Sequence, residues 1–436
     1  MEAMARPPPK IERRLAATQL VHPASGQVLD SGMAVFLTSP RTATGEDMAE
    51  LHVHGAPAVV AAVLDGLQAL ASHTPMRMAL PGEFTRRALA AGKMDLVQVE
   101  GLADLLAASS EAQRATALAA ALGNHSATYT AWTEAAAHAL AMAEAMVDFG
   151  EDEGLDAAAL DAALDALRPT AADMASALAG ARASMAIRDG ARVALGGLPN
   201  AGKSSMLNVL AGRDAAIVDA TPGTTRDALE VPLDLGGFPV VVADTAGVRA
   251  SPESSIEAEG IRRAQAAWRD AAIRVLVVDD GGQAVDDALS ALAPPLPQLV
   301  VLNKADTRAA DASAAAAARI ASRLPGVGLV EISCADQVGI DALEAELTAA
   351  VSAYFDDGDR GTGSSTSEGV VVTRARVRDH LRTAHDSLVR AFDARAEPDL
   401  VGEALRDAVA ALGSITGVVD AEAVLDIVFA EFCIGK

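Results

Sequence analysis

Residues 197–204 read GLPNAGKS and fit the phosphate-binding loop pattern G-x-x-x-x-G-K-[ST] at every specified position. The apolar run 193–195 precedes this loop and the helix-compatible segment 205–210 follows it, which is the strand–loop–helix setting that the pattern needs. In such loops, backbone N–H groups and the helix N-terminus surround the phosphates. The stretch therefore predicts nucleoside triphosphate binding, with Lys203 on the terminal phosphates and the Ser204 hydroxyl on Mg²⁺.

Two later segments indicate that the base is guanine. The NKAD segment 303–306 follows an apolar strand, and its Asp306 carboxylate can accept two N–H groups that guanine has and adenine lacks. Lys304 would pack its stem on the base. The ISCA segment 332–335 stands where GTPases place the loop that backs the guanine. Together with the phosphate loop, these motifs predict a GTPase.

The segments between these motifs predict the parts that sense the γ-phosphate. A DTAG segment at 244–247 follows an apolar strand, and Asp244 would hold Mg²⁺ through water. Thr225, in the sequence TPGTTRD, would close over Mg²⁺ and the γ-phosphate. The residue after DTAG is Val248, which cannot orient a water molecule, so a polar residue from elsewhere must do so. The candidates in the polar segment that follows are Glu253, Glu257 and Glu259.

Composition limits the class of protein. The 436 residues are 51% hydrophobic, enough for more than one domain, and the net charge of −24 argues against a general polyanion-binding surface. The two cysteines, Cys334 and Cys433, cannot make a disulfide framework, so a reducing cytoplasm fits. Neither a secretory signal nor an apolar run long enough for a membrane span is visible. We therefore expect a cytoplasmic protein without a membrane partner.

Changes in hydrophobic period along the chain predict a multidomain protein of α/β and all-α parts. Residues 17–90 mix short β-like runs with one helical stretch, and 96–186 are nearly all helical, broken near 150–154 and at Pro169. Strand and helix then alternate as in a doubly wound parallel sheet, and a Gly/Ser/Asp linker at 356–369 precedes further helix. The predicted segments are 1–91, a small α+β domain; 92–188, the first helical part; 189–356, an inserted Ras-like P-loop GTPase domain; and 357–436, the second helical part.

The chain resembles the MnmE (TrmE) family, the bacterial GTPases that modify the wobble uridine of tRNA. The resemblance lies in the internal GTPase domain, TGEDMAELHVHG at 44–55, PGEFTRRA at 81–88 and the terminal FCIGK at 432–436, and it runs from about residue 29 to the end. It implies an N-terminal domain that binds folate and dimerises. It also implies a partner, the FAD protein MnmG, in a heterotetramer or larger complex. The implied product is an aminomethyl or carboxymethylaminomethyl group on carbon 5, with a formyl- or methylene-tetrahydrofolate as carbon donor.

The resemblance assigns roles to individual residues. It implies that K⁺ sits between two GTPase domains in place of an arginine finger, held by Asn200, Asp219, Thr221 and Thr224, although relatives often carry Thr or Ser where Asp219 stands. Catalytic roles fall to Glu257, which precedes Gly-Ile in the family motif, to Lys203 and to Cys433. Mg²⁺ would be held by Ser204 and Thr225, and folate by Glu50, Lys93 and Lys436. The residues expected to contact GTP are Asn200, Ala201, Gly202, Lys203, Ser204, Ser205, Asp219, Thr224, Thr225, Asp244, Thr245, Ala246, Gly247, Asn303, Lys304, Asp306, Ser333, Cys334 and Ala335.

At its beginning the chain departs from the family pattern. Family chains usually open with a strand and a Gly-rich loop, then a strand that ends in Ile-Arg-x-Ser-Gly, and this chain starts beyond them. The arginine of that strand, a folate contact in the family, therefore has no counterpart. We expect either a start codon placed too late or a truncated N-terminal domain with a weaker folate site. The first is favoured, because losing a core strand would expose apolar surface.

Plainer interpretations stay open beside these. His52 and His54 alternate on a predicted strand, where structural hydrogen bonding is commoner than metal binding. Cys433 could simply be a buried apolar residue. Four basic residues near the start of the last helical block form either a solvated helix face or a local contact for tRNA or a partner; they are Arg374, Arg376, Arg378 and Arg382.

Two other classes of function share the same motifs. A ribosome-assembly GTPase of the Era/Der type would also carry NxGKS and PGTTRD, but it would show a basic RNA-binding C-terminal domain or a second GTPase domain. A nucleotide-gated scaffold would bind GTP without chemistry of its own on tRNA. A folate-binding assay separates the scaffold from the enzyme.

Overall fold

The structure of the chain is a computed structural model. It describes residues 4–6, 13–71, 76–149, 157–212, 230–244, 255–292, 294–359 and 372–417. The chain divides into two compact units, of which one comprises Met1–Ala103, Ala120–Ser126 and Thr416–Lys436, and the other Asp104–Ala119 and Ala127–Ile415. The phosphate-binding loop belongs to the second unit.

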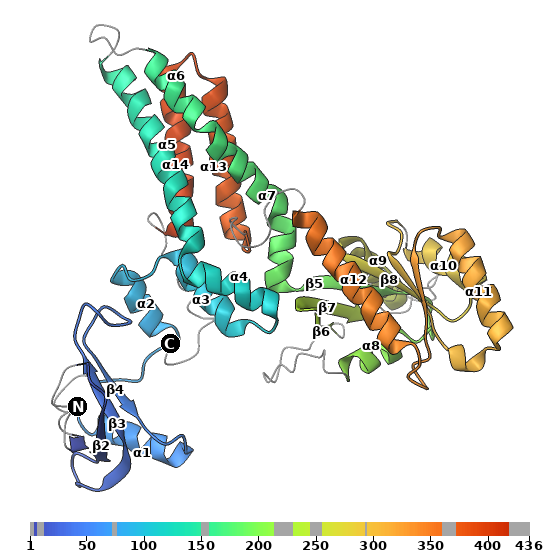
Figure 1. Ribbon diagram of the computed structural model, residues 1–436, viewed down its shortest axis with the longest axis horizontal. Coiled ribbons are helices and arrows are strands. Elements are labelled where there is room, and N and C mark those ends of the chain that lie inside the picture. The colour runs from blue at the N-terminus through green and yellow to red at the C-terminus, as the bar shows by residue number, and fades with distance from the viewer. Residues whose placement is uncertain are drawn as a thin grey trace. The chain divides into compact units, whose positions relative to one another are not determined.

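The first unit contains a four-stranded antiparallel sheet in the order β1-β2-β3-β4, with a helix packed on it (Figure 1). Its elements are β1 (Ala5–Arg6), β2 (Ala16–Val21), β3 (Val28–Leu37), β4 (Met48–His52), α1 (Pro57–Gln68) and α2 (Glu83–Ala90). Met4, Leu20, Ala34 and Val63 form the buried core between sheet and helix. The small α+β unit predicted for this part of the chain is confirmed.

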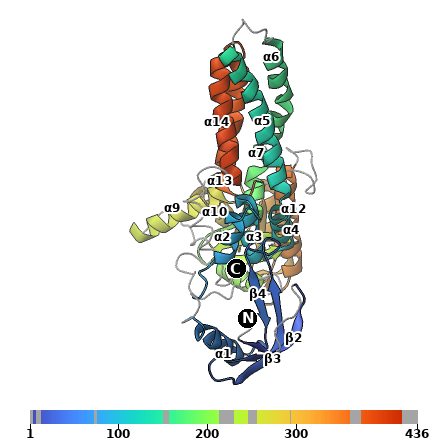
Figure 2. The same ribbon diagram turned by 90° about the vertical axis from the view of Figure 1, so that its left-hand side faces the viewer.

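Two helices, α3 (Leu96–Ala107) and α4 (Glu111–Ala121), lead into a bundle that forms part of the second unit. The bundle helices are α5 (Asn124–Phe149), α6 (Ala157–Ala166), α7 (Arg168–Asp189), α13 (Ala375–Asp393) and α14 (Pro398–Thr416), and they run alongside one another (Figures 1 and 2). Gly402 of α14 faces α5, where a Cβ atom on it would lie 3.9 Å from the Cβ of Ala143, an ordinary van der Waals contact. The predicted break at Pro169 is confirmed, because α6 ends at Ala166 and α7 begins at Arg168, which puts the proline in the first turn of the new helix, where no intrahelical N–H donor is needed.

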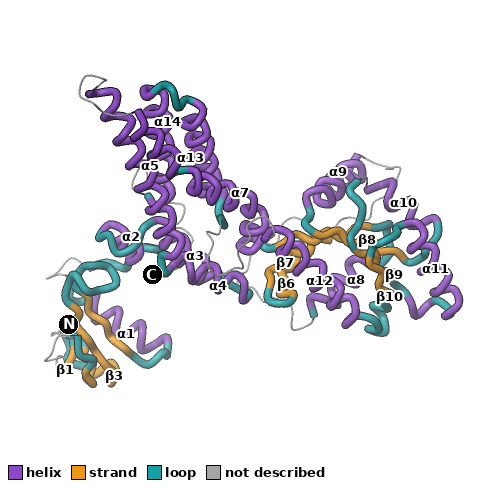
Figure 3. The backbone as a smooth tube through the Cα atoms, turned by 45° about the horizontal axis from the view of Figure 1, so that its top comes forward, coloured by secondary structure: helices purple, strands orange, loops and turns teal. Residues whose placement is uncertain are grey.

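A six-stranded sheet in the order β10-β9-β8-β5-β7-β6 forms the rest of the second unit (Figure 3). Its strands are β5 (Ala191–Gly196), β6 (Glu230–Leu235), β7 (Phe238–Asp244), β8 (Ile273–Val278), β9 (Leu299–Leu302) and β10 (Gly328–Glu331). All neighbours pair in parallel except β6, which runs antiparallel to β7 because a two-residue turn at Gly236 and Gly237 joins them. The predicted doubly wound sheet is confirmed, with one antiparallel edge strand that the sequence analysis missed.

Helices cover both faces of this sheet. They are α8 (Lys203–Ala211), α9 (Ser255–Asp270), α10 (Gln283–Leu292), α11 (Ala310–Arg323) and α12 (Ile340–Asp359). One buried cluster joins α8 and α12 to the strands, and a second joins α9, α10 and α11 to them, with Trp268 fully buried in the second. The helix α12 continues into the predicted linker as far as Asp359, because Phe355 anchors its last turns in the first cluster.

A shared carboxylate joins the two ends of the inserted GTPase domain to the helical part. The Asp104 Oδ1 atom accepts hydrogen bonds from the Arg188 Nε atom at 3.0 Å and the Arg374 Nη2 atom at 2.7 Å. Arg188 lies just before β5, and Arg374 lies just before α13, which packs on α7. The phosphate-binding domain is therefore inserted between helices that pack together, as predicted.

The predicted basic run on α13 is largely engaged within the protein. Arg374 binds Asp104, and the Arg376 guanidinium donates to the carbonyl oxygens of Ser414 and Ile415 at 2.8 and 3.1 Å, at the end of α14. Arg378 pairs with the neighbouring Asp379 at 2.9 Å. The idea that these arginines form a contact surface for tRNA therefore loses two of its members to structural roles. Among the residues that the structure describes, none of the helices combines the length and apolar character of a membrane span.

Candidate nucleotide-binding site

The phosphate-binding loop joins β5 to α8. At two positions its backbone conformation and close surroundings admit only glycine. Gly197 and Gly202 have φ angles of 147° and 96°, and Asn200 has a φ of 67°. A Cβ atom on Gly202 would lie 2.0 Å from the Asn303 Nδ2 atom, and one on Gly197 would lie 2.2 Å from the Val277 carbonyl oxygen. Both glycines are thus required by close approach as well as by conformation.

Lys203, the first residue of α8, is buried inside this loop. Its side-chain ammonium donates to the carbonyl oxygens of Gly197 and Leu198 at 3.1 and 3.0 Å, and the residue is 6% exposed. The loop thus holds a positive charge against its own backbone, where a phosphate would meet it together with the N-terminus of α8. Ser204 and Ser205 follow Lys203 in the first turn of α8, and both are exposed.

Asn303 connects the phosphate loop with the predicted base site. It is 2% exposed, and its Nδ2 atom donates to the Ala201 carbonyl oxygen at 3.0 Å. Its Oδ1 atom accepts from the backbone N–H of Cys334 at 3.4 Å. One side chain therefore holds two of the predicted GTP-contacting segments together.

Asp306 presents its carboxylate at the surface, where a hydroxyl group orients it. Ser333, which is 1% exposed, donates its Oγ–H to the Asp306 Oδ1 atom at 2.7 Å and accepts from the backbone N–H of Asp336 at 3.1 Å. The backbone of the NKAD segment is tied to the same loop, because the Ala305 N–H donates to the Ile332 carbonyl oxygen at 3.0 Å. The structure thus brings the NKAD and ISCA segments together as the sequence analysis predicted.

Two side chains of this site have features that the motifs did not predict. The Lys304 ammonium lies 2.8 Å from the Asp279 Oδ2 atom at the end of β8, so a carboxylate orients the lysine that was expected to pack on the base. Asp279 could have been suspected from the sequence, since it directly follows a buried strand. Burial raises the pKa of the half-buried Cys334 thiol, which keeps that thiol protonated and argues against a nucleophilic role.

Several predicted residues lie outside the described part of the chain, so their roles stay predictions. They are Asp219, Thr221, Thr224, Thr225, Thr245, Ala246, Gly247, Cys433 and Lys436, and the side chains of Asp244 and Glu257 lie outside it as well. The backbone of Asp244 ends β7, and that of Glu257 lies in the first turn of α9.

Two residues predicted to bind folate lie in the first unit. Glu50 is on β4, where its carboxylate lies 3.2 Å from the His52 Nε2 atom. Lys93 follows α2 and is exposed. A Cβ atom on Gly45 would lie 3.6 Å from the Lys93 Cε atom, so the beginning of the 44–55 segment lies against the aliphatic part of the lysine side chain. Lys93 thus lies beside one of the two segments of the N-terminal domain on which the resemblance was based.

The histidines of this unit have structural partners. The prediction that His52 and His54 share a strand face is wrong, because His54 lies beyond the end of β4. Its backbone N–H and its Nδ1 atom contact the Asp30 carboxylate at 2.9 and 2.8 Å, and the hydrogen bonds from His54 lower the pKa of Asp30. Within the described residues no group of three or more His, Cys, Asp or Glu side chains could hold a metal ion. The contacts of His52 with Glu50 and of His54 with Asp30 support a structural role for these histidines.

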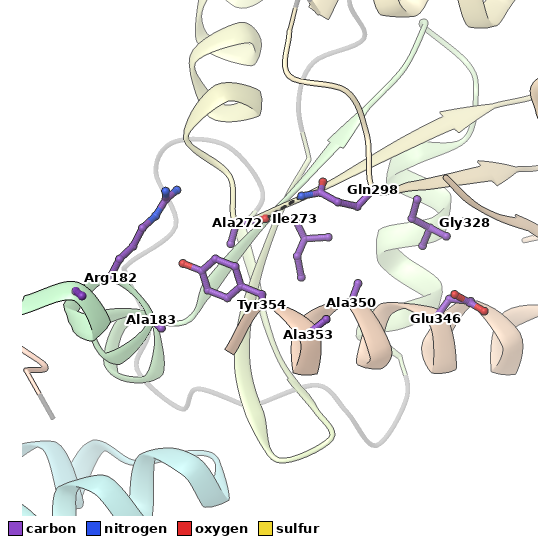
Figure 4. A pocket seen from close by; sticks show the side chains of 12 residues that line it. Arg182, Ala183, Ala272, Ile273, Gln298, Gly328, Glu346, Ala350, Ala353 and Tyr354 are labelled. Atoms are coloured by element: carbon purple, nitrogen blue, oxygen red, sulfur yellow. Dashed lines mark hydrogen bonds between the residues drawn. The ribbon is translucent and has the colours of Figure 1, made fainter. Parts of the chain in front are cut away.

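A pocket of about 620 Å³, whose lining Figure 4 shows, lies at the amino ends of the strands, whereas the phosphate loop follows the carboxyl end of β5. It is lined by the first residues of β8, β9 and β10, by Arg182 of α7 and by Tyr354 of α12. Gln298 closes one side by donating to the Ala272 carbonyl oxygen at 3.3 Å. Because ligands of open α/β sheets bind beyond the carboxyl ends of the strands, this pocket is not the nucleotide site.

Comparison with known proteins identifies the family. The model "GTP-binding protein TrmE N-terminus" matches residues 1–93, and the model "MnmE helical domain" matches residues 96–433. The chain belongs to the MnmE family. Within this family, the motifs described above make the protein a GTP hydrolase.

Relatives in the MnmE family are similar over nearly the whole chain. A protein of Parvibaculum lavamentivorans named tRNA modification GTPase MnmE is 45% identical over 417 residues, which cover 95% of this chain and 88% of the relative. The mitochondrial 5-taurinomethyluridine-[tRNA] synthase subunit GTPB3 of Rattus norvegicus is 40% identical, with 100% and 87% covered. Among solved structures, the FeoB G domain of Methanococcus jannaschii is 26% identical and covers 37% of this chain and 98% of its own, with a TM-score of 0.28.

Proposed function

We propose that this GTPase modifies carbon 5 of the wobble uridine in certain tRNAs, by aminomethyl or carboxymethylaminomethyl addition, together with an MnmG-type flavoprotein. The observation that carries the proposal is the family match, which spans both the N-terminal and the helical model. The names of the relatives, a tRNA modification GTPase and a tRNA synthase subunit, support tRNA as the substrate. With a net charge of −24, the tRNA contact must be local or supplied by the partner. In this proposal the protein is a homodimer and acts in the cytoplasm.

The geometry of the loops supports the proposed binding of GTP and Mg²⁺. Lys203 and the backbone N–H groups that open α8 would bind the phosphates, and Asp306 would bind the guanine edge. The Ser204 hydroxyl stands in the turn next to the buried lysine, which fits an Mg²⁺ ligand, and Thr225 would be the second. When bound, Mg²⁺ neutralises charge on the β- and γ-phosphates.

We expect Glu257→Ala to lower the rate of GTP hydrolysis by about 10²–10⁴-fold while GTP affinity stays near the parental value. The reason is that Val248 cannot orient water, so an acidic residue at the start of α9 has to act as general base, directly or through a bridging water. Steady-state hydrolysis and equilibrium binding of a fluorescent GTP analogue measure the two effects. Glu259→Ala is the matched control, and a parental rate for Glu257→Ala would transfer the role to Glu253 or Glu259.

The proposed folate contacts fit the chemistry of that cofactor where the structure describes them. The half-exposed Glu50 carboxylate is a hydrogen-bond acceptor for the N–H groups of a pterin ring, and the exposed Lys93 ammonium suits the carboxylates of the folate tail. Lys436 is the third proposed contact. When bound, a one-carbon tetrahydrofolate supplies the carbon that is transferred.

We expect Cys433→Ser to abolish wobble-uridine modification but to leave the GTPase rate intact, because the family resemblance assigns Cys433 a catalytic role and the residue belongs to none of the GTP-binding motifs. Melting temperature, GTPase rate and tRNA modification are measured on the same variant. A packing role predicts a different pattern, namely a lower melting temperature with modest losses of both activities. Normal modification by the variant would refute the functional role.

The proposed function as a whole is tested by mass spectrometry of tRNA. Wobble uridines of a strain that lacks this gene should lose their carbon-5 group, and the intact gene should restore it. A Lys203→Ala gene should fail to restore it, because the phosphate loop loses its buried charge. If the deletion strain keeps fully modified wobble uridines, the proposal is wrong.

A further inference from the structure

Arg308 lies two residues beyond the NKAD segment and belongs to none of the motifs, yet it is the most heavily bonded side chain near the predicted base site. Its side chain is 12% exposed. The Nη1 atom donates to the carbonyl oxygens of Asn303 and Asp279 at 2.6 and 2.8 Å. The Nη2 atom lies 3.1 Å from the Glu331 Oε1 atom, and the Nε atom donates to the Ser313 Oγ atom at 3.3 Å.

These four partners come from four different segments at one end of the sheet. Asp279 directly follows β8, Asn303 directly follows β9, Glu331 ends β10, and Ser313 lies in the first turn of α11. The Ser313 hydroxyl also donates to Glu331, so Arg308, Ser313 and Glu331 form a closed ring of hydrogen bonds. Only arginine presents five donors in a rigid planar fork, and a lysine could satisfy part of this set.

Three of the four bonded segments lead within a few residues to a group that the base site uses. Asn303 stands three residues before Asp306, and Glu331 stands two residues before Ser333, the donor that orients the Asp306 carboxylate. Asp279 carries the carboxylate that holds Lys304. Fixing these three strand ends relative to one another therefore fixes the carboxylate that faces guanine, the hydroxyl that orients it and the lysine beside it.

We propose that Arg308 is a positioning residue for guanine recognition, which sets the place of the Asp306 carboxylate by clamping the ends of β8, β9 and β10. It acts through Asp306 and touches no nucleotide itself. The inference rests on the proposed assignment of Asp306 to the guanine edge. Arg308 thus serves base specificity as well as the stability of the sheet.

The test is a competition experiment with full-length protein, in which unlabelled GTP or ITP displaces a fluorescent GDP analogue. ITP lacks only the 2-amino group of guanine, so the ratio of GTP to ITP affinity measures the Asp306 contact with that group. We expect Arg308→Gln to lower GTP affinity about tenfold or more and to bring the ratio toward one, with a smaller change in ITP affinity. Arg308→Lys should recover part of the ratio, since an ammonium can still reach the Asn303 and Asp279 carbonyl oxygens.

Arg323→Gln is the matched control. This arginine ends α11 and pairs with Asp286 of α10 at 2.9 Å, away from the base site, so the control should keep the parental ratio. A folded Arg308→Gln protein that keeps the parental ratio of GTP to ITP affinity, or that loses affinity for both nucleotides equally, overturns the inference. If Arg308→Gln does not fold, an unchanged ratio in Arg308→Lys overturns it instead. A parental protein that does not distinguish GTP from ITP contradicts the assignment of Asp306 instead, which separates the two failures.

Discussion

Replacing K⁺ by Na⁺ should lower the rate of GTP hydrolysis by about 10³–10⁵-fold, which is the contribution of a positive charge at the transferring phosphate. No arginine finger is evident in the sequence, and Asn200 offers a side-chain oxygen in the phosphate loop, where it is exposed and has a left-handed backbone. The other proposed ligands are Asp219, Thr221 and Thr224. K⁺ held there would supply the missing charge, and because the family resemblance implies a site for K⁺, the rate should be high in K⁺ and low in Na⁺.

The proposed cation site is completed only when two GTPase domains pair. The rate per molecule in K⁺ should therefore rise with protein concentration, whereas the small rate in Na⁺ should not. Asn200→Ala should make the two salts nearly equivalent by lowering the rate in K⁺. Equal rates of the parental protein in Na⁺ and K⁺ at matched ionic strength would defeat the proposal.

Asp306→Asn should lower GTP affinity by about 10²–10⁴-fold and should raise affinity for xanthosine triphosphate. The carboxylate accepts two N–H groups of guanine, and charged hydrogen bonds contribute about 1.5–3 kcal/mol each, where 1.4 kcal/mol corresponds to a factor of ten. An asparagine turns an NH₂ group toward the 2-amino group of guanine, which is unfavourable. The same NH₂ group can donate to the 2-oxo group of xanthine. Competition binding with GTP and xanthosine triphosphate measures the loss of one affinity and the gain of the other.

The asparagine at 306 can still accept the Ser333 hydroxyl, so the loop should keep its shape. Asp311→Asn is the control, because Asp311 is exposed in the first turn of α11 and neighbours the site without belonging to it. If Asp306→Asn retains parental GTP affinity while Asp311→Asn reduces it, the base site has been placed on the wrong carboxylate.

Local patterns were sufficient to predict the phosphate loop and the base loops, since each motif fixes its own backbone. Gly202 illustrates why: its missing side chain is required by a contact with Asn303, which is itself part of a motif. Arg308 and Asp279 could not be found in this way. Their importance depends on which strand ends meet at the sheet edge, and that order places β8 between β9 and β5 although β5 comes first in the chain.

The fold shows the same division between local and long-range information. Apolar periodicity was enough to predict the helical blocks and the alternating strands and helices. The basic run on α13 could not be assigned to structural roles until the end of α14 and Asp104 were placed beside it. The antiparallel edge strand β6 is different, because the Gly236-Gly237 turn that joins it to β7 is a local signal typical of a hairpin.

The shared Asp104 oxygen indicates where the GTPase domain could be removed from the chain. Because Arg188 and Arg374 meet on one atom, the backbone leaves the helical bundle and returns to it at nearly the same place. Domains whose ends lie close together are the ones that can be inserted into a host, or removed from it, without unravelling the host. A short linker between the end of α7 and the start of α13 should therefore keep the helical bundle continuous when the GTPase domain is removed.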